Sequence, residues 1–284
     1  MGGGRPVAEV RGVRRVLGNA ETRAGAAIIL VFVALGVFAG WLAPYDPLAM
    51  DLGRAFRPPG GAHLLGTDNF GRDLFSRIVF GARYSLLTGC AAVAIALALA
   101  VPLGLTAGYY GGWWDGLLMR AVDVLLAFPT ILLAIAIVTI VGPNLQNAMV
   151  AVGIASVPLF ARLVRGSVLV VKQQGYVEAA RGLGERRWRI AVRHVLPNCL
   201  AVLVVQSSLR MGAAILTAAG LSFLGLGAQP PLPEWGAMVN QGKDFLHQSL
   251  AMSVFPGLAI MLVVLGFNVF GDGLNKALNP QFPE

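Results

Sequence analysis

The amino-acid sequence predicts an all-α polytopic membrane protein with about six transmembrane helices. Of its 284 residues, 56% are hydrophobic and only 13% are charged, whereas about a quarter of the residues of a typical soluble domain carry a charge. The mean hydropathy is +0.71. Apolar runs of about 20 residues recur along the chain, and this is the length that a helix needs to cross a bilayer.

A polar and basic N-terminal tail, residues 1–23, precedes the first predicted membrane helix at residues 24–43. The apolar run of this helix is longer than the roughly 7–15 residues that are typical of the apolar region of a cleavable signal peptide. No clear cleavage motif of small residues follows it. We therefore expect the segment to be retained as a membrane helix.

Residues 44–84 form the longest predicted connection, which is expected on the outer side of the membrane. Its first part is rich in proline and glycine, as loops are. Thr67 or Asp68 is then suited to cap a helix, and Leu74 and Ile78 recur on one face of that helix. This pattern predicts an amphipathic helix at the membrane interface. The alternative is a surface helix that packs against the bundle.

Five further membrane helices complete the predicted core domain, residues 85–271, which a tail at residues 272–284 follows. Pro129 is expected to bend the third helix of the chain, and Pro158 interrupts the fourth. Trp235 lies in a proline-rich outer loop and is expected at the membrane interface. The five helices are predicted at residues 85–108, 121–141, 146–166, 199–221 and 251–270.

The distribution of basic residues predicts how the chain is oriented in the membrane. With the N-terminus inside, the inner connections contain fifteen lysine and arginine residues and the outer connections contain six. The positive-inside rule therefore places both termini and the loop at residues 167–197 in the cytoplasm. This orientation accounts for the net charge of +8 better than binding of a nucleic acid does.

The predicted cytoplasmic loop contains the most distinctive segment of the chain, residues 178–197, which read EAARGLGERRWRIAVRHVLP. Ala179 and Ala180 favour a short helix that packs closely against a partner, and Glu178 suits the first turn of this helix. Gly184 permits a sharp backbone turn. We expect two short helices that are joined at Gly184.

The second short helix is expected to present a basic face, which begins with Arg186 and Arg187, and an apolar face for contact with a partner. His194 and Leu196 follow, and Pro197 is expected to end the segment before the next membrane helix. A basic loop is also what membrane orientation alone requires, so composition does not by itself indicate a docking surface. The apolar positions are Trp188, Ile190, Ala191 and Val195.

The spacing within residues 178–197 distinguishes these alternatives. It follows the order E-A-A-x3-G-x9-I-x-L-P, with His194 at the isoleucine position, and it resembles the EAA loop of permease subunits of ABC importers. Three further blocks resemble the branch of this family that transports dipeptides and oligopeptides, although Ala218 stands where many members have an acidic residue. These blocks are GTDNFGRDLFSRIVFGARYSL, GYYGGWWDGLLMRAVDVLLAFPTILLA, and the pair LSFLGLGAQPPLPEWGAM and FNVFGDGLNKALNP.

The resemblance implies a type I ABC importer permease fold and transport of dipeptides or oligopeptides across the bacterial inner membrane. Glutathione, a nickel chelate or another small solute are alternative cargoes. The implied partners are a homologous B-type permease subunit, two cytoplasmic ATPase subunits, an extracytoplasmic substrate-binding protein and membrane lipids. The chain has no G-x4-G-K-[S/T] phosphate-binding sequence. ATP is therefore expected to bind to the partner subunits, and we expect neither enzymatic activity nor a cofactor in this chain.

Charged residues within the predicted spans are few. Arg210 lies near the middle of the fifth helix, where a charge is costly unless it faces water or a partner. It is expected either to line the translocation path or to pack against backbone carbonyls or a neighbouring subunit. Arg120 and Asp123 are expected to pair at the cytoplasmic end of the third helix. A secondary transporter, the less favoured alternative, would need more ionisable residues inside the spans.

The distribution of histidine and cysteine argues against a metal site and against a membrane-embedded enzyme. His63, His194 and His247 are scattered along the chain, and only His194 falls in a predicted cytoplasmic segment. Cys90 and Cys199 both lie in or next to apolar spans. We therefore expect neither a disulfide nor a bound metal.

Overall fold

The computed structural model of the protein describes residues 18–278. Most of the predicted N-terminal tail and residues 279–284 lie outside the described residues. Within the described part, every named element is a helix, and a β-bridge between Thr67 and Asp73 is isolated. Five helical stretches are long and apolar enough to cross a membrane, and a bent pair of helices makes a sixth. The predicted all-α membrane fold is confirmed.

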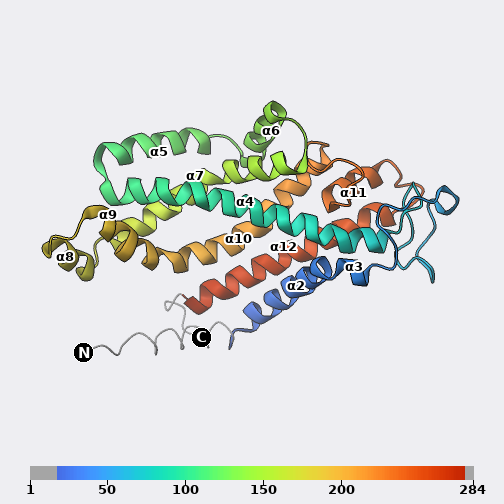
Figure 1. Cartoon of the computed structure of the whole chain (residues 1–284), viewed down its shortest axis with the longest axis horizontal. Helices are drawn as coiled ribbons and strands as arrows, with labels where there is room; N and C mark the ends of the chain where they lie inside the picture. Colours follow the sequence, from blue (N-terminus) through green and yellow to red (C-terminus); the bar gives the residue numbers. More distant parts are fainter. Residues whose placement is uncertain (1–17, 279–284) are drawn as a thin grey trace.

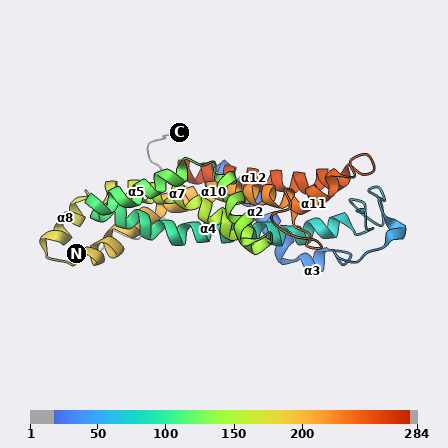
Figure 2. The same ribbon diagram turned by 90° about the horizontal axis from the view of Figure 1, so that it is seen from above.

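The molecule is elongated, and its long helices run beside one another along its length (Figure 1). Two short helices, α8 (Gly175–Gly182) and α9 (Arg187–Ile190), project from one end. The short helices α3 (Ala39–Leu42) and α11 (Trp235–Lys243) lie toward the opposite end. The view from above shows the same separation (Figure 2).

The first and last long helices, α2 (Ala20–Val37) and α12 (Ala251–Leu278), pack against each other through glycines. A methyl group added to Gly25 would lie 2.7 Å from the Cα atom of Phe270, and one on Gly273 would lie 2.5 Å from the backbone nitrogen of Thr22. Small residues of this kind let membrane helices approach closely. Helix α12 extends beyond the predicted end at residue 270, so part of the predicted C-terminal tail is helical.

The predicted amphipathic helix of the outer segment is not a separate element. Residues 67–73 form a loop, and Asp73, rather than Thr67 or Asp68, caps helix α4 (Leu74–Tyr110) by accepting a hydrogen bond from the Ser76 backbone nitrogen at 2.7 Å. Leu74 is buried in the core instead of facing the membrane interface. Helix α4 has 37 residues, or about 55 Å at 1.5 Å per residue, so it extends past a hydrocarbon layer of about 30 Å.

The third predicted span is broken into α5 (Gly112–Leu126) and α6 (Thr130–Val141), which meet at 90°. Pro129 lacks a backbone N–H and disfavours helical geometry at the preceding Phe128, so the helix ends there. The expected bend at Pro129 is therefore a full break. Helix α5 also begins earlier than residue 121, because the chain turns at Gly111, whose φ is +68°.

The fourth and fifth spans are longer than predicted. Helix α7 (Leu145–Val171) continues through Pro158. Helix α9 continues through a π-helical turn (Ala191–Val195) into α10 (Leu196–Phe223), so the helical stretch runs from Arg187 to Phe223. Pro197 was expected to end the segment, but it lies in the first turn of α10, a position at which a missing N–H is well tolerated.

The prediction that Trp235 lies at the membrane interface is wrong. Its side chain is fully buried, its Nε1 donates a hydrogen bond to the Ile78 carbonyl at 3.0 Å, and its ring meets Phe32 edge-on at 5.6 Å. Glu234 caps α11 by accepting a hydrogen bond from the Ala237 backbone nitrogen at 2.9 Å. Burial raises the pKa of the Glu234 carboxyl. The loop that was predicted on the outer side therefore joins α2, α4 and α11 in one core.

Candidate functional site

The predicted cytoplasmic loop forms a compact helical knob, residues 175–195, at one end of the molecule (Figure 1). Because α7 continues to Val171, the segment between the long helices is shorter than residues 167–197. Helix α8 and helix α9 lie on either side of Gly184, as the sequence predicted.

Gly184 determines the turn between these two helices. Its φ is +77°, which is the left-handed region that disfavours other residues by about 1–2 kcal/mol. The backbone nitrogen of Gly184 donates to the Arg181 carbonyl at 3.0 Å, and that of Glu185 donates to the Ala180 carbonyl at 3.2 Å. These bonds close the end of α8 in the manner of a glycine C-cap.

The inner face of the knob is packed against the long helices. Ile190, Ala191 and Val195, which were predicted to contact a partner, are buried inside the chain, because they share the face of the helix that turns toward α7. Val177 of α8 is also fully buried there. Together they form one cluster with Tyr109, Val164, Val168, Cys199 and Leu203.

The outer face of the knob leaves large apolar side chains uncovered. Leu183 is 88% exposed and Trp188 is 55% exposed, and Tyr176 and Val192 are also exposed. Apolar side chains that cluster at the surface mark sites of interaction with a partner or a membrane. Of the four predicted apolar contacts, Trp188 alone is available to a partner. Leu183 was missed, because the sequence shows it only as one residue beside a turn.

The polar residues that the sequence singled out surround this apolar face. Glu178 and Ala179 are exposed on α8, and Ala180 is half-buried against the inner cluster. Arg186 and Arg187 are exposed at the start of α9. The outer surface of the knob therefore combines apolar contacts with positive charge.

His194 links the C-terminal part of the knob to the turn between its two helices. Its Nε2 lies 2.8 Å from the Oε2 of Glu185, next to the glycine turn, while its backbone belongs to the π-helical turn. Leu196 is half-buried and Pro197 is exposed where α10 begins. Sequence reasoning missed Glu185, because its partner is nine residues away and only the fold of the knob brings them together.

Ion pairs fasten helix α5 to helix α7, which supports the knob. Arg165 donates through Nε and Nη2 to the carboxylate of Asp115, at 2.5 and 2.7 Å. Asp123 pairs with Arg162 of α7. The predicted pairing of Asp123 with Arg120 is therefore wrong, because the packing of α5 against α7 offers a partner that the helical spacing does not reveal.

Arg210 lies apart from the knob, at an exposed position on α10. The structure records no ion pair between its guanidinium group and another described residue. It borders neither of the cavities described here. Its role in a translocation path stays a prediction.

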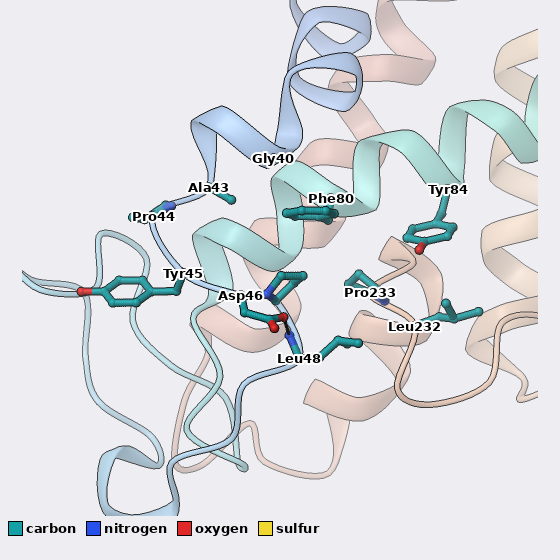
Figure 3. Close-up of a pocket in the computed structure, with 11 residues that line it drawn as sticks. Gly40, Ala43, Pro44, Tyr45, Asp46, Leu48, Phe80, Tyr84, Leu232 and Pro233 are labelled. Atoms are coloured by element: carbon teal, nitrogen blue, oxygen red, sulfur yellow. Dashed lines mark hydrogen bonds between the residues drawn. The ribbon is translucent and has the colours of Figure 1, made fainter.

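The end opposite the knob holds a cavity of about 530 Å³ (Figure 3). Tyr45 and Asp46 come from the loop after α3, Phe80 and Tyr84 come from α4, and Pro233 comes from the loop before α11. The Asp46 carboxylate accepts a hydrogen bond from the Leu48 backbone nitrogen at 2.8 Å. No sequence signal indicated this cavity, because three segments far apart in the chain create it.

Comparisons with known proteins identify the family. Residues 100–282 match the family described as "Binding-protein-dependent transport system inner membrane component". The chain belongs to this family. Residues 14–59 of the permease match a second family description, "N-terminal TM domain of oligopeptide transport permease C".

Two relatives show how similar the permease is to other members. It is 49% identical over 269 residues to the glutathione transport system permease protein GsiD of Pectobacterium atrosepticum. The matched region covers 94% of this chain and 89% of the relative. It is also 49% identical over 257 residues to the dipeptide transport system permease protein DppC of Alkalihalophilus pseudofirmus. This matched region covers 90% of this chain and 84% of the relative.

The fold of the permease is similar to that of a chain in an inward-facing structure of the MetNI methionine ABC transporter. The TM-score is 0.57 at 20% identity, over 72% of this chain and 97% of the other. The type I ABC importer permease fold is thereby confirmed. With its long apolar helices, the permease is a multi-pass inner-membrane protein of an ABC importer. Membership implies ATPase subunits, a binding protein and a second permease as partners.

Proposed function

We propose that the permease carries small peptides and that the knob receives the movement of an ATPase subunit on its outer face. The observation that carries this proposal is the tip of the knob, where Leu183 is 88% exposed beside the turn at Gly184. When a partner covers a large apolar side chain at such a tip, the complex is stabilised by about 25 cal/mol per Å² of apolar surface removed from water.

The packing behind the tip explains how a push there would reach the membrane helices. Val177, Ile190 and Val195 are fully buried against α7 and α10. Packed interiors have low compressibility and transmit strain. Because α9 runs through the π-helical turn into α10 without a break, a displacement of the knob tilts α10 directly.

The knob is proposed to face the cytoplasm, together with both ends of the chain. The start of α2 and the end of α12 both point toward the end of the molecule that carries the knob (Figure 1), and Lys276 pairs with Glu21 at 2.6 Å, which joins these two helix ends. The excess of basic residues on this side, fifteen against six, supports this orientation by the positive-inside rule.

The names of the relatives support short peptides as the cargo. One relative belongs to a dipeptide system and another to a glutathione system, and both kinds of cargo are short peptides with free carboxylates. We therefore place di- and tripeptides, including glutathione, ahead of a nickel chelate. The permease would act beside one B-type permease, two ATPases that bind and hydrolyse ATP, and one extracytoplasmic binding protein. It would itself bind no cofactor and catalyse no reaction.

The substitution Leu183→Asp tests the role of the knob. We expect ATPase subunits to be lost from the purified importer and peptide uptake to fall at least about tenfold, because a charged group replaces an apolar contact worth about 1.5–3 kcal/mol. The matched control is Leu52→Asp, since Leu52 is 72% exposed at the opposite end. Equal uptake in the two variants would refute the proposed role of the knob.

A further inference from the structure

A second cavity, of about 200 Å³, lies at the end opposite the knob. It is bordered by Arg72 and Arg77, by the loop at residues 225–232 and by one face of α11. Arg72 is 1% exposed and Arg77 is 2% exposed, and arginine is almost never fully buried unless it is paired. The partners of these two guanidinium groups therefore decide what the cavity can hold.

The two arginines have fewer acceptors than donors. Arg72 donates through Nε to Asp68 at 2.6 Å and through Nη2 to the side-chain oxygen of Gln241 at 3.0 Å. Arg77 donates through Nη1 to the Pro47 carbonyl at 3.0 Å, and its Nε lies 3.7 Å from the same Asp68 oxygen. Each guanidinium has five N–H donors, so several remain without an acceptor among residues 18–278.

The cavity is the space beside these remaining donors, because both arginines border it. The side-chain atoms that are sealed inside the described part of the chain without a hydrogen-bond partner belong to other residues, namely Thr22, His63, Asn69, Tyr109 and Ser253. The unpartnered arginine nitrogens are not among these sealed atoms, so a group in the cavity can meet them.

We propose that this cavity binds the carboxylate of a small peptide at the outer end of the permease. Arginine presents paired N–H groups in a fork that matches a carboxylate, and Gln241 holds one fork in place. Sites that enclose a whole small molecule measure about 300–1,000 Å³, so this smaller cavity takes the terminal group of the peptide and leaves the rest outside. The inference goes beyond the knob but rests on the proposed peptide cargo.

The carboxylates near the cavity differ in burial, and this decides which of them can be replaced to test the proposal. Asp68 is buried and is shared by both arginines, whereas Asp244, the residue after α11, borders the cavity and is exposed. Asp73, which precedes α4, is already engaged with His63 and with Ser76. Of the nearby carboxylates, Asp244 is therefore the one whose removal changes the charge of the cavity without leaving a buried group unpaired.

Cysteine labelling reports on the cavity directly. Asn240 borders it, so Asn240→Cys is made in an importer in which Cys90→Ser and Cys199→Ser remove the native thiols. Right-side-out vesicles without the binding protein are treated with a membrane-impermeant maleimide. We expect Ala-Ala to slow the labelling, and Ala-Ala amide to need at least about a tenfold higher concentration, because a hydrogen bond to a charged group contributes about 1.5–3 kcal/mol.

Two further substitutions in this background separate the cavity from the surrounding surface. Asp244→Asn is expected to lower the protecting concentration of Ala-Ala about two- to fivefold, as expected for removal of an exposed like charge. Asp46→Asn, at the border of the larger cavity, should leave it unchanged. Failure of Asp244→Asn to shift the protection would contradict the proposal.

Other outcomes overturn the proposal in distinct ways. Equal protection by the peptide and its amide would mean that the carboxylate is not what binds, and no protection would mean that the cavity holds water only. A cysteine that never reacts would mean that the cavity is closed to solvent. Protection that requires the binding protein would assign the carboxylate to that protein instead. Peptide uptake is measured in cells that carry the same variant and the binding protein. Normal uptake, with no protection of the cysteine by the peptide in vesicles, would refute this site while leaving the proposed function intact.

Discussion

At the scale of single residues, two glycines of the knob have the same free space but different backbones. A side chain on Gly182 or on Gly184 would meet no atom within 4 Å. Gly182 is the last residue of helix α8, whereas Gly184 has a φ of +77°. Only the second position therefore requires glycine, and the requirement comes from the backbone instead of from packing.

This difference leads to a matched pair of substitutions. Gly184→Ala should lower peptide uptake about fivefold or more, because a left-handed alanine costs about 1 kcal/mol or more and shifts the turn away from its working geometry. Gly182→Ala should leave uptake unchanged, since alanine favours a helix. Uptake of a labelled dipeptide is compared at equal amounts of permease in the membrane. Equal loss in both variants would show that the turn geometry is not what matters.

At the scale of elements, helix ends and helix contacts depend on small residues and prolines. Helices α2 and α12 approach closely at Gly25 and Gly273, which meet backbone atoms of the other helix. Pro129 breaks the third span, whereas Pro158 remains inside α7. A proline in an apolar run therefore does not by itself decide whether the helix ends there.

The seam between α2 and α12 can be tested by adding one methyl group. Gly25→Ala should destabilise the permease by at least about 1–3 kcal/mol, because the backbone of Phe270 cannot move aside as a side chain can. Gly166→Ala on α7 is the control, since open space surrounds that position. Thermal unfolding of the detergent-purified importer measures both. A Gly25→Ala variant as stable as the control would contradict the close contact.

At the scale of the whole molecule, the proposed functional surfaces are divided between its two ends. The knob lies at one end and the two cavities lie at the other. The pair of Lys276 with Glu21 joins the ends of α2 and α12 that point toward the knob. The long helices connect the two ends of the molecule, and α10 is continuous with the knob. This arrangement is suited to carrying movement from a motor on one side of the membrane to a binding surface on the other.

The division between the ends predicts opposite labelling from the two sides of the membrane. In spheroplasts of a Cys90→Ser strain, an impermeant maleimide should label Leu64→Cys, because Leu64 is 58% exposed at the cavity end. Leu183→Cys should react only after the membrane is opened and the ATPase is removed. Labelling of Leu183→Cys in intact spheroplasts would place the knob outside and would overturn the proposed orientation.

Much of the local structure was readable from the sequence, because it depends on the residues of one segment. The lengths of the apolar runs predicted the spans, and the Glu-Ala-Ala and glycine spacing predicted two short helices around Gly184. The basic residues Arg186 and Arg187 were correctly expected at the surface. These features follow from hydropathy and backbone preference, which act within a few residues along the chain.

The tertiary structure alone decided which side chains meet across the chain. In the folded chain Ile190 and Val195 are buried, whereas Leu183 is exposed. Asp123 forms its ion pair with Arg162 instead of Arg120. The tertiary structure also placed Arg72 and Arg77 around one cavity with α11. Such choices depend on how helices far apart in sequence pack, and the energy of a contact is gained only when both partners are in place. For that reason, the composition of a segment does not predict its partners.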